Sequence, residues 1–332
     1  MSDRERDVLG ELIRAAGRRP TPPHDDYERV LNASRSAWQK KVRSRRRRQW
    51  SYALAASLAT FAIGLTAILE VMPMGPGPEI ASTAIVDGEV MVLTPGAENW
   101  QFLDEADNQL VAGTRLRTQA EGRVALDLAP GVSVRVNHRS ELTLLSSDRI
   151  ELTAGTVYID SGLGVRANRF EIATSFGTVR DIGTQFEVSS SPAALRVRVR
   201  EGLVELYQDR QEPELSGSAG EELRIDSRGM VERAPFSTYD QEWAWASALA
   251  DVPQTDGQSL IGFLRWVARE MGRSLRFSGP GDEAQAQTVT LHGSATALAP
   301  MEALDVMLAT TDFEYALLED GVLLIQRREL VR

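Results

Sequence analysis

The fold is indicated most clearly by residues 174–206, which read TSFGTVRDIGTQFEVSSSPAALRVRVREGLVEL. Apolar and polar residues alternate through this stretch, most plainly in Leu195–Val199. Alternation with a period of two is typical of a β-strand that has one buried face and one exposed face. The glycines Gly177, Gly183 and Gly202 interrupt the alternation, as glycine does where the backbone needs a positive φ or a close approach. The stretch therefore predicts several short strands.

The same pattern extends over residues 84–231 and predicts one all-β domain. The alternating runs recur about every 8–10 residues with turn residues between them. Tight-turn pairs are scarce, and from Val132 to Asp160 the runs follow one another like rungs, so that a solenoid-like roll and a sandwich are both open. The predicted strands are Val90–Leu93, Arg123–Leu128, Val132–Val136, Leu142–Leu144, Ile150–Leu152, Thr156–Ile159, Phe170–Ile172, Gly177–Val179, Gln185–Val188, Leu195–Val199 and Leu203–Leu206.

The carboxyl-terminal residues 258–328 show a mixed pattern, which predicts a small α+β domain. Residues 232–257 form a linker that contains a short helix, Tyr239–Ala250, with Trp243 and Trp245. Apolar residues recur at helical spacing from Leu260 to Met271, and Gly272 ends that helix. The elements predicted after it are a strand at Ser274–Phe277, a strand at Thr288–Leu291, a helix that begins at Pro300, and a hairpin from Phe313 to Gln326.

Ahead of these domains lies an uncharged apolar run of about 20 residues, Trp50 to Leu69. A helix of that length spans about 30 Å, the thickness of the hydrocarbon core of a bilayer. We therefore predict a transmembrane helix at residues 50–71, followed by a linker rich in proline and glycine at residues 72–83. A buried core helix and a cleaved signal peptide are the alternatives, but the run is longer than a secretory apolar segment and 49 residues precede it.

Charge is distributed unevenly on the two sides of the predicted span. Residues 1–49 hold 14 Lys and Arg against 7 Asp and Glu, and the rest of the chain holds 23 against 40, which together give the net charge of −10. The block Arg45, Arg46, Arg47 and Arg48 adjoins the span as a topology signal. The positive-inside rule then predicts a single-pass inner-membrane protein with a cytoplasmic amino end and a periplasmic carboxyl end. An acidic body argues against nucleic acid as a partner.

The head, residues 1–49, is predicted to form two amphipathic helices that are too small to bury a core of their own. One interpretation is a solvated tail with a second helix that the membrane stabilises. The other is a helical hairpin that docks on a partner protein, since tryptophan and tyrosine on a marginal helix favour binding. The candidate partner-binding residues are Leu9, Leu12, Tyr27, Leu31 and Trp38.

The sequence shows no pattern of a catalytic, cofactor or metal site. It contains no cysteine, and its three histidines, His24, His138 and His292, lie in three different segments. A zinc site or a Ser-His-Asp arrangement would need such residues to converge. No P-loop, dinucleotide fingerprint or nucleophile elbow is present. We therefore expect a protein that is not an enzyme and that needs no cofactor.

Within residues 84–231 the chain resembles the FecR domain. The resemblance rests on an ordered pattern: Thr174-x-x-Gly177-x-Val179, then Gly183-Thr184-x-Phe186-x-Val188, then Val199-x-Glu201-Gly202-x-Val204. Its motif residues, interpreted as structural, are Thr174, Gly177, Gly183, Thr184, Phe186 and Gly202. Residues 258–328 resemble the short amino-terminal (STN) domain of secretins and TonB-dependent transporters, on Val289–Gly293 and Ala303–Leu308.

The FecR resemblance implies an anti-sigma factor or sigma-factor regulator. In that family the cytoplasmic head binds an extracytoplasmic-function sigma factor, and the outer body receives a signal from the periplasmic domain of a TonB-dependent outer-membrane transporter. The alternative is a cell-envelope scaffold or sensor whose outer domains bind a protein or an envelope polymer without controlling a sigma factor.

Overall fold

The computed structural model describes residues 77–328, except 105–108, 129–130, 163–169, 209–212 and 297, together with residues 11, 14 and 15. The chain divides into two units, Met1–Gly75 and Pro76–Arg332, and nearly all of the described residues belong to the second. The partner-binding residues predicted in the head, the arginine block and the predicted span at 50–71 all lie outside the described residues. Among the described residues no helix has the length and apolar character to cross a membrane.

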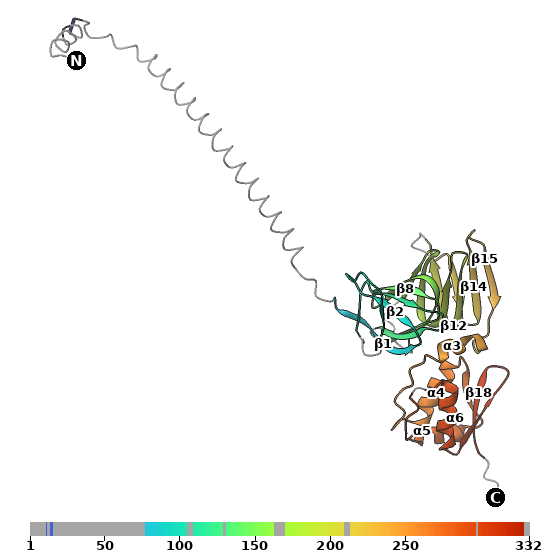
Figure 1. Ribbon diagram of the computed structural model, residues 1–332. Coiled ribbons are helices and arrows are strands. Elements are labelled where there is room, and N and C mark those ends of the chain that lie inside the picture. Colours follow the sequence, from blue (N-terminus) through green and yellow to red (C-terminus); the bar gives the residue numbers. More distant parts are fainter. Residues whose placement is uncertain are drawn as a thin grey trace. The chain divides into compact units, whose positions relative to one another are not determined.

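Fifteen strands form one continuous sheet that makes up most of the second unit (Figure 1). These strands are β1 Glu79–Asp87, β2 Val90–Leu93, β3 Gln101–Phe102, β4 Leu110–Val111, β5 Arg115–Thr118, β6 Arg123–Leu128, β7 Val132–Val136, β8 Glu141–Ser146, β9 Arg149–Asp160, β10 Glu171–Thr174, β11 Gly177–Ser190, β12 Ala194–Tyr207, β13 Leu215–Ser218, β14 Glu221–Asp226 and β15 Val231–Pro235. The first strand begins at Glu79, inside the stretch that the sequence assigned to a linker.

The sheet curves around a single apolar core, because its longest strands each pair with different neighbours along their length. The first half of β9 pairs with β8 and β10, and its second half pairs with β7 and β11. The main path runs β15-β14-β12-β11-β10-β9-β7-β6-β1-β4. One cluster of buried side chains collects residues from β1 through β14. The domain is therefore one folded-over sheet, and neither separate rungs nor two independent sheets describe it.

Three pairs of predicted strands prove to be single long strands. Ile150–Leu152 and Thr156–Ile159 both belong to β9. Gly177–Val179 and Gln185–Val188 both belong to β11, and Leu195–Val199 and Leu203–Leu206 both belong to β12. The register between β11 and β12 shifts between Ile182 and Gln185, which marks a bulge. A bulge takes up an extra residue and bends the strand without ending it, so Gly183 and Gly202 lie inside continuous strands. Gly177 is the first residue of β11 and does mark a strand end.

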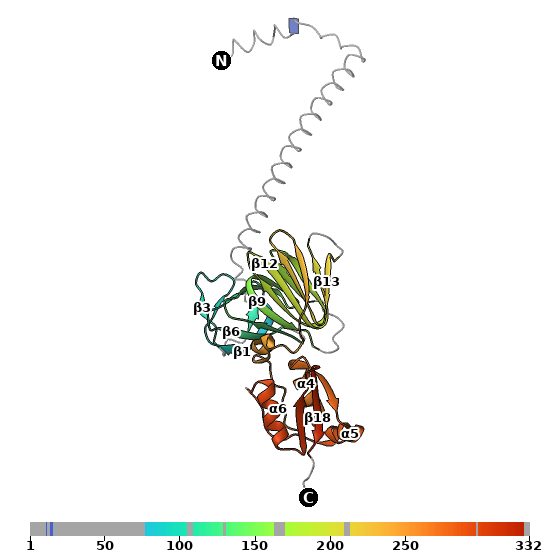
Figure 2. The same cartoon turned by 90° about the vertical axis from the view of Figure 1, so that its right-hand side faces the viewer.

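The carboxyl-terminal part contains a three-stranded sheet in the order β16-β18-β17, with β16 parallel and β17 antiparallel to the central strand (Figure 2). Its elements, and the two short ones that lead to it, are η1 Gln241–Trp243, α3 Ala244–Ser247, α4 Leu260–Glu270, β16 Ser274–Phe277, α5 Pro280–Thr288, α6 Pro300–Ala309, β17 Phe313–Leu317 and β18 Val322–Arg327. Leu264, Leu304 and Leu323 are fully buried where α4 and α6 pack on the sheet.

Two predictions for this part are wrong in detail. The strand predicted at Thr288–Leu291 does not form, and only Thr290 makes an isolated bridge to Ser259. Instead, the segment Pro280–Thr288, PGDEAQAQT, folds as helix α5. This helix buries only Asp282 and Ala286, so its sequence shows no apolar stripe. The helix predicted at Tyr239–Ala250 is a 3-10 turn followed by one α-helical turn.

Candidate functional site

The motif residues predicted in the sheet serve three separate structural tasks. Thr174 closes the β10–β11 hairpin, since its Oγ1 donates to the Gly177 carbonyl at 2.8 Å and accepts from the Phe176 amide at 3.2 Å. Phe186 is fully buried in the core. These residues fix a turn and a core position, and neither offers a reactive group to solvent.

The other motif residues meet at the bulge of β11. Thr184 is fully buried, its amide donates to Ser161 Oγ at 2.8 Å, and its Oγ1 donates to Asp181 Oδ2 at 3.3 Å. Gly202 faces it from β12 with a φ of +83°, and a Cβ there would lie 2.5 Å from Thr184 Cγ2 and 2.7 Å from the Gly183 carbonyl oxygen. Only glycine combines this backbone angle with this close approach.

A row of charged and polar side chains crosses the outer face of the sheet. Side chains alternate between the two faces of a strand. Val134 and Val136 lie in the core, so Arg135 between them points outward. The strand register aligns it with four residues of neighbouring strands, and we call the set the outer row: Arg135, Tyr158, Glu187, Arg198 and Glu222. The first four are at most 7% exposed, because residues 236–250 and α4 cover them.

Arg135 forms the most buried ion pair of the described residues. Its Nη1 lies 2.7 Å from Glu270 Oε2 and its Nη2 lies 2.9 Å from Glu270 Oε1, and the two side chains are 3% and 5% exposed. Nη1 also donates to the Ala246 carbonyl at 2.8 Å. A two-pronged pair of this kind is strong and directional. It joins strand β7 to the last residue of helix α4.

A second ion pair joins the same helix to the next row of the sheet. Arg269 donates to Asp160 Oδ2 at the end of β9, and its Nε lies 3.2 Å from Glu201 Oε2. Asp160 also accepts from Gln185 Nε2 and from the Gly162 amide, at 2.8 and 2.9 Å. Two consecutive residues of α4 thus form ion pairs with the sheet: Arg269 pairs with Asp160, and Glu270 pairs with Arg135.

The connecting segment between the two parts packs on the outer row through its aromatic residues. Trp243 is 1% exposed and meets Tyr158 edge to face at 5.8 Å between ring centroids. Trp245 Nε1 donates to Glu187 Oε2 at 3.1 Å. Arg198 lies 3.8 Å from the centroid of the Phe236 ring and donates to Glu222 and Glu242 at 2.6 and 2.5 Å.

Burial and charge set the ionisation of these groups. Burial raises the pKa of Tyr158 to about 12, so it stays a neutral phenol. Burial acts to lower the pKa of Arg135, but the Glu270 carboxylate outweighs it and the pKa lies above its usual value. Burial acts to raise the pKa of Asp160, but Arg269, Gln185 and the Gly162 amide together hold it below its usual value. The arrangement holds fixed, paired charges, and we call it the junction: the outer row, Asp160, Arg269, Glu270, and residues 236–250.

Comparison with known proteins supports the assignment of the sheet. Residues 114–205 match the family model described as FecR protein. The chain carries a FecR domain. This stretch contains every motif residue named above and most of the outer row.

Two crystal structures of a candidate anti-sigma factor from Parabacteroides distasonis, at 2.50 and 1.65 Å resolution, also resemble the chain. They share 14% identity with it, cover 64% and 65% of it and 97% and 99% of their own length, and give TM-scores of 0.33 and 0.34. Scores of this size are too low to carry an argument. None of the curated proteins matches the chain.

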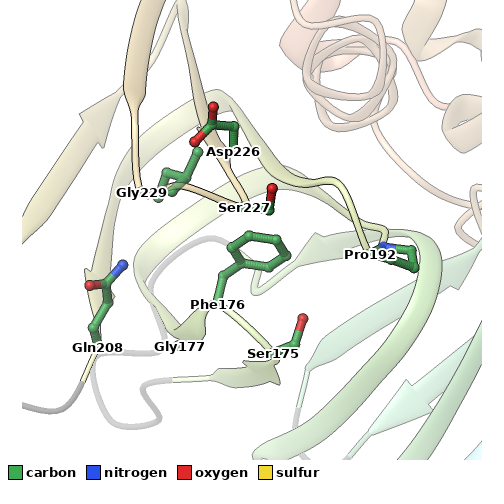
Figure 3. A pocket seen from close by; sticks show the side chains of 9 residues that line it. Ser175, Phe176, Gly177, Pro192, Gln208, Asp226, Ser227 and Gly229 are labelled. Carbon is green, nitrogen blue, oxygen red and sulfur yellow. The ribbon is translucent and has the colours of Figure 1, made fainter.

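A hollow of about 510 Å³ lies at one end of the FecR domain (Figure 3). The Phe176 ring stands between Ser175 and Ser227, with Gln208 and Pro192 on opposite sides. The one carboxylate, Asp226, accepts from the amides of residues 228 and 230 and so shapes a turn. Throughout the described part of the chain, no group of three His, Asp or Glu side chains could hold a metal ion.

The junction residues of the FecR domain were not singled out by the sequence. Arg135, Arg198 and Glu187 stand at outward positions of alternating strands, which normally face solvent. The signal that could have found them is the pair Trp243 and Trp245 in the connecting segment, because large aromatic residues outside a strand need a surface to cover.

Proposed function

We propose that the protein is a FecR-like regulator of a sigma factor, which receives an envelope signal outside the inner membrane and acts on the sigma factor inside it. The FecR domain at residues 114–205 is the observation that carries this proposal. Thr184 and Phe186 of that domain are buried, and its motif residues fix a hairpin turn, the bulge and the core, so the domain supplies a rigid scaffold for a regulator.

Two features of the sequence support a protein that acts in two compartments. An apolar run suited to a membrane span, Trp50 to Leu69, lies within the proposed transmembrane helix at residues 50–71, and the arginine block Arg45–Arg48 stands just before it. The head before the span is basic and the body after it is acidic. We propose a single-pass inner-membrane topology with a cytoplasmic head and a periplasmic body.

The junction suggests how a signal is handled in the body. Buried ion pairs and aromatic contacts join α4 and the connecting segment to the FecR domain. A partner that binds the STN-like carboxyl-terminal part would therefore displace both parts together, as one body. We propose that this partner is the signalling domain of a TonB-dependent outer-membrane transporter, and that the inner step is regulated proteolysis or release of a masked head, because a single helix transmits an angle poorly through fluid lipid.

The test uses the tagged full-length chain in its native cell, with an extracytoplasmic-function sigma factor identified by mass spectrometry and a sigma-dependent reporter. The variant Leu31→Asp/Trp38→Asp should lose the sigma factor and change reporter activity, because both apolar contacts become charged. Ser34→Asp/Ser36→Asp adds the same two charges at polar positions and should retain both. A wild-type chain that retains no sigma factor, with the protein intact, contradicts the proposal and favours the envelope scaffold.

A further inference from the structure

Two adjoining hollows of about 500 and 390 Å³ form one groove along strand β16. They share Arg265 of α4 and Leu275 of β16, so the groove runs without a break between the helix and the strand. Leu275, Arg276 and Phe277 all line it. Consecutive residues point to opposite faces of a sheet, so a surface that all three line is the edge of the strand. We call this groove the β16 groove.

The backbone of β16 is unpaired along this edge. Among the described strands β16 pairs with β18 alone. The amides of Ser274 and Ser278, four residues apart, donate to the carbonyls of Gly321 and Ile325, both at 3.0 Å. Every second residue, Ser274, Arg276 and Ser278, therefore directs its backbone groups toward β18. The N–H and C=O groups of Leu275 and Phe277 therefore point away from β18, into the groove. An open edge of this kind is a template for an added strand.

The side chains that line the β16 groove are strongly basic. Arg265 and Arg269 lie one helical turn apart on α4, Arg273 follows the helix, and Arg276 stands on the strand. Arg269 is neutralised by Asp160 and Glu201. Arg265 and Arg276 are exposed, and the described residues offer neither of them a hydrogen bond or an ion pair.

Arg273 keeps its charge as well. It donates to the Leu318 carbonyl and lies 4.6 Å from the centroid of the Tyr239 ring, and neither contact is an anion. Among the described residues that line the groove, the acidic ones are Glu201 and Glu283. Arg200, which is buried and donates to the Thr238 carbonyl, lines the groove as well. Four arginines that the described residues do not pair with a carboxylate thus gather in a protein whose net charge is −10.

We infer that the β16 groove binds an extended acidic segment of a partner protein, which adds as a strand to β16. The outward N–H and C=O groups of Leu275 and Phe277 would pair with the backbone of the segment. Arg265 and Arg276 would meet its carboxylates from either side, as guanidinium groups match carboxylate geometry. The inference goes beyond the proposed function and stands whether or not the head binds a sigma factor.

The test measures binding of a fluorescent seven-residue peptide of alternating Glu and Val to the purified full-length chain in detergent, by anisotropy. Three probes are matched to it: the same peptide with Lys for Glu, the same peptide N-methylated at every second amide, and inorganic polyphosphate. We expect the acidic peptide to bind at least tenfold more tightly than the lysine and N-methylated peptides, and polyphosphate not to displace it at equal charge.

Two protein variants distinguish binding in the β16 groove from nonspecific attraction to a positively charged surface. Arg265→Glu/Arg276→Glu should weaken binding at least tenfold, and Arg228→Glu, an exposed arginine on a β14–β15 turn, should leave it unchanged. A melting curve checks that each variant is folded. In the wild type, the peptide should slow hydrogen exchange of the Leu275 and Phe277 amides.

Several outcomes would overturn the inference. Equal binding of the N-methylated peptide would show that the strand edge is not used. Displacement by polyphosphate, or equal loss in Arg228→Glu, would mean a general polyanion surface. No binding of the acidic peptide at 1 mM would refute the groove outright. None of these results depends on the sigma factor, so the failure of this inference and that of the proposed function are distinct.

Discussion

Arg135 and Glu270 stand 135 residues apart in the chain and meet through two hydrogen bonds of 2.7 and 2.9 Å. Arg135 is the last residue but one of strand β7 in the FecR domain, and Glu270 ends helix α4 in the carboxyl-terminal part. Water is excluded from both side chains. The pair can form only when the FecR domain and the carboxyl-terminal part are docked. Substitutions at these two residues therefore test the junction most directly.

Removing one member of this pair should destabilise the protein more than replacing both. Arg135→Met or Glu270→Met leaves a buried charge without its partner, which costs about 3–5 kcal/mol. The double variant leaves no charge and should cost clearly less than either single change. Urea unfolding of all three variants measures the coupling. Additive losses, with the double variant the least stable, would mean that the pair contributes no interaction of its own.

Replacing Gly272 should undock the carboxyl-terminal part. Gly272 has a φ of +61°, and a Cβ there would lie 1.9 Å from the Thr238 carbonyl oxygen and 2.3 Å from Arg200 Nε. Gly272→Ala should cost at least about 2 kcal/mol, since both backbone strain and a clash oppose it.

Gly257→Ala is the matched control for that change, because Gly257 also has a positive φ but its Cβ would meet nothing within 4 Å. It should cost about 1 kcal/mol, from backbone strain alone. Limited proteolysis of residues 236–257 reports undocking. Equal stability and equal protease resistance in the two variants would show that the close approach to Thr238 is not needed.

Alanine substitutions at the two glycines of the FecR-domain bulge, Gly183 and Gly202, should differ in their effect on stability. Gly202→Ala should be the more damaging change, because its Cβ would collide with Thr184, whereas the Cβ of Gly183→Ala would meet nothing within 4 Å. We expect the loss for Gly202→Ala to exceed the other by about 1–3 kcal/mol, the cost of forcing extra volume into a packed site. Thermal unfolding of both variants checks the order, and the reverse order would be inconsistent with the packing described.

The Asp160–Arg269 pair should make the junction sensitive to acid. The folded chain holds the pKa of Asp160 below its usual value of about 4. Its contribution is therefore fully present above pH 4 and is lost as the pH falls through the lower folded value. Asp160→Asn should be less stable at pH 7 and should show a flatter loss between pH 5 and pH 3. Unfolding midpoints across that range test it, and an unchanged pH profile would exclude Asp160 as a contributor.

Local pattern predicted the elements whose neighbours lie close in the chain. Alternation in Leu195–Val199 marked its strand, and the apolar spacing of Leu260–Met271 marked α4. Helix α5 has no apolar stripe, so its sequence carries no periodic signal, and the helix was not predicted. The ordered Thr-Gly-Phe pattern pointed correctly to a FecR domain, because those residues meet the demands of a hairpin, a bulge and a core.

The sequence by itself thus determined a β-rich body, a mixed carboxyl-terminal domain, and a basic head and apolar run whose structure stays a prediction. Only the tertiary structure decided that Arg135, Glu187 and Arg198 are buried and that β16 offers a basic open edge. The physical reason is that alternation tells which residues share a face of a strand, but not what covers that face. Whether an outward arginine meets water, Glu270 or an empty groove depends on segments that lie up to 135 residues away in the chain.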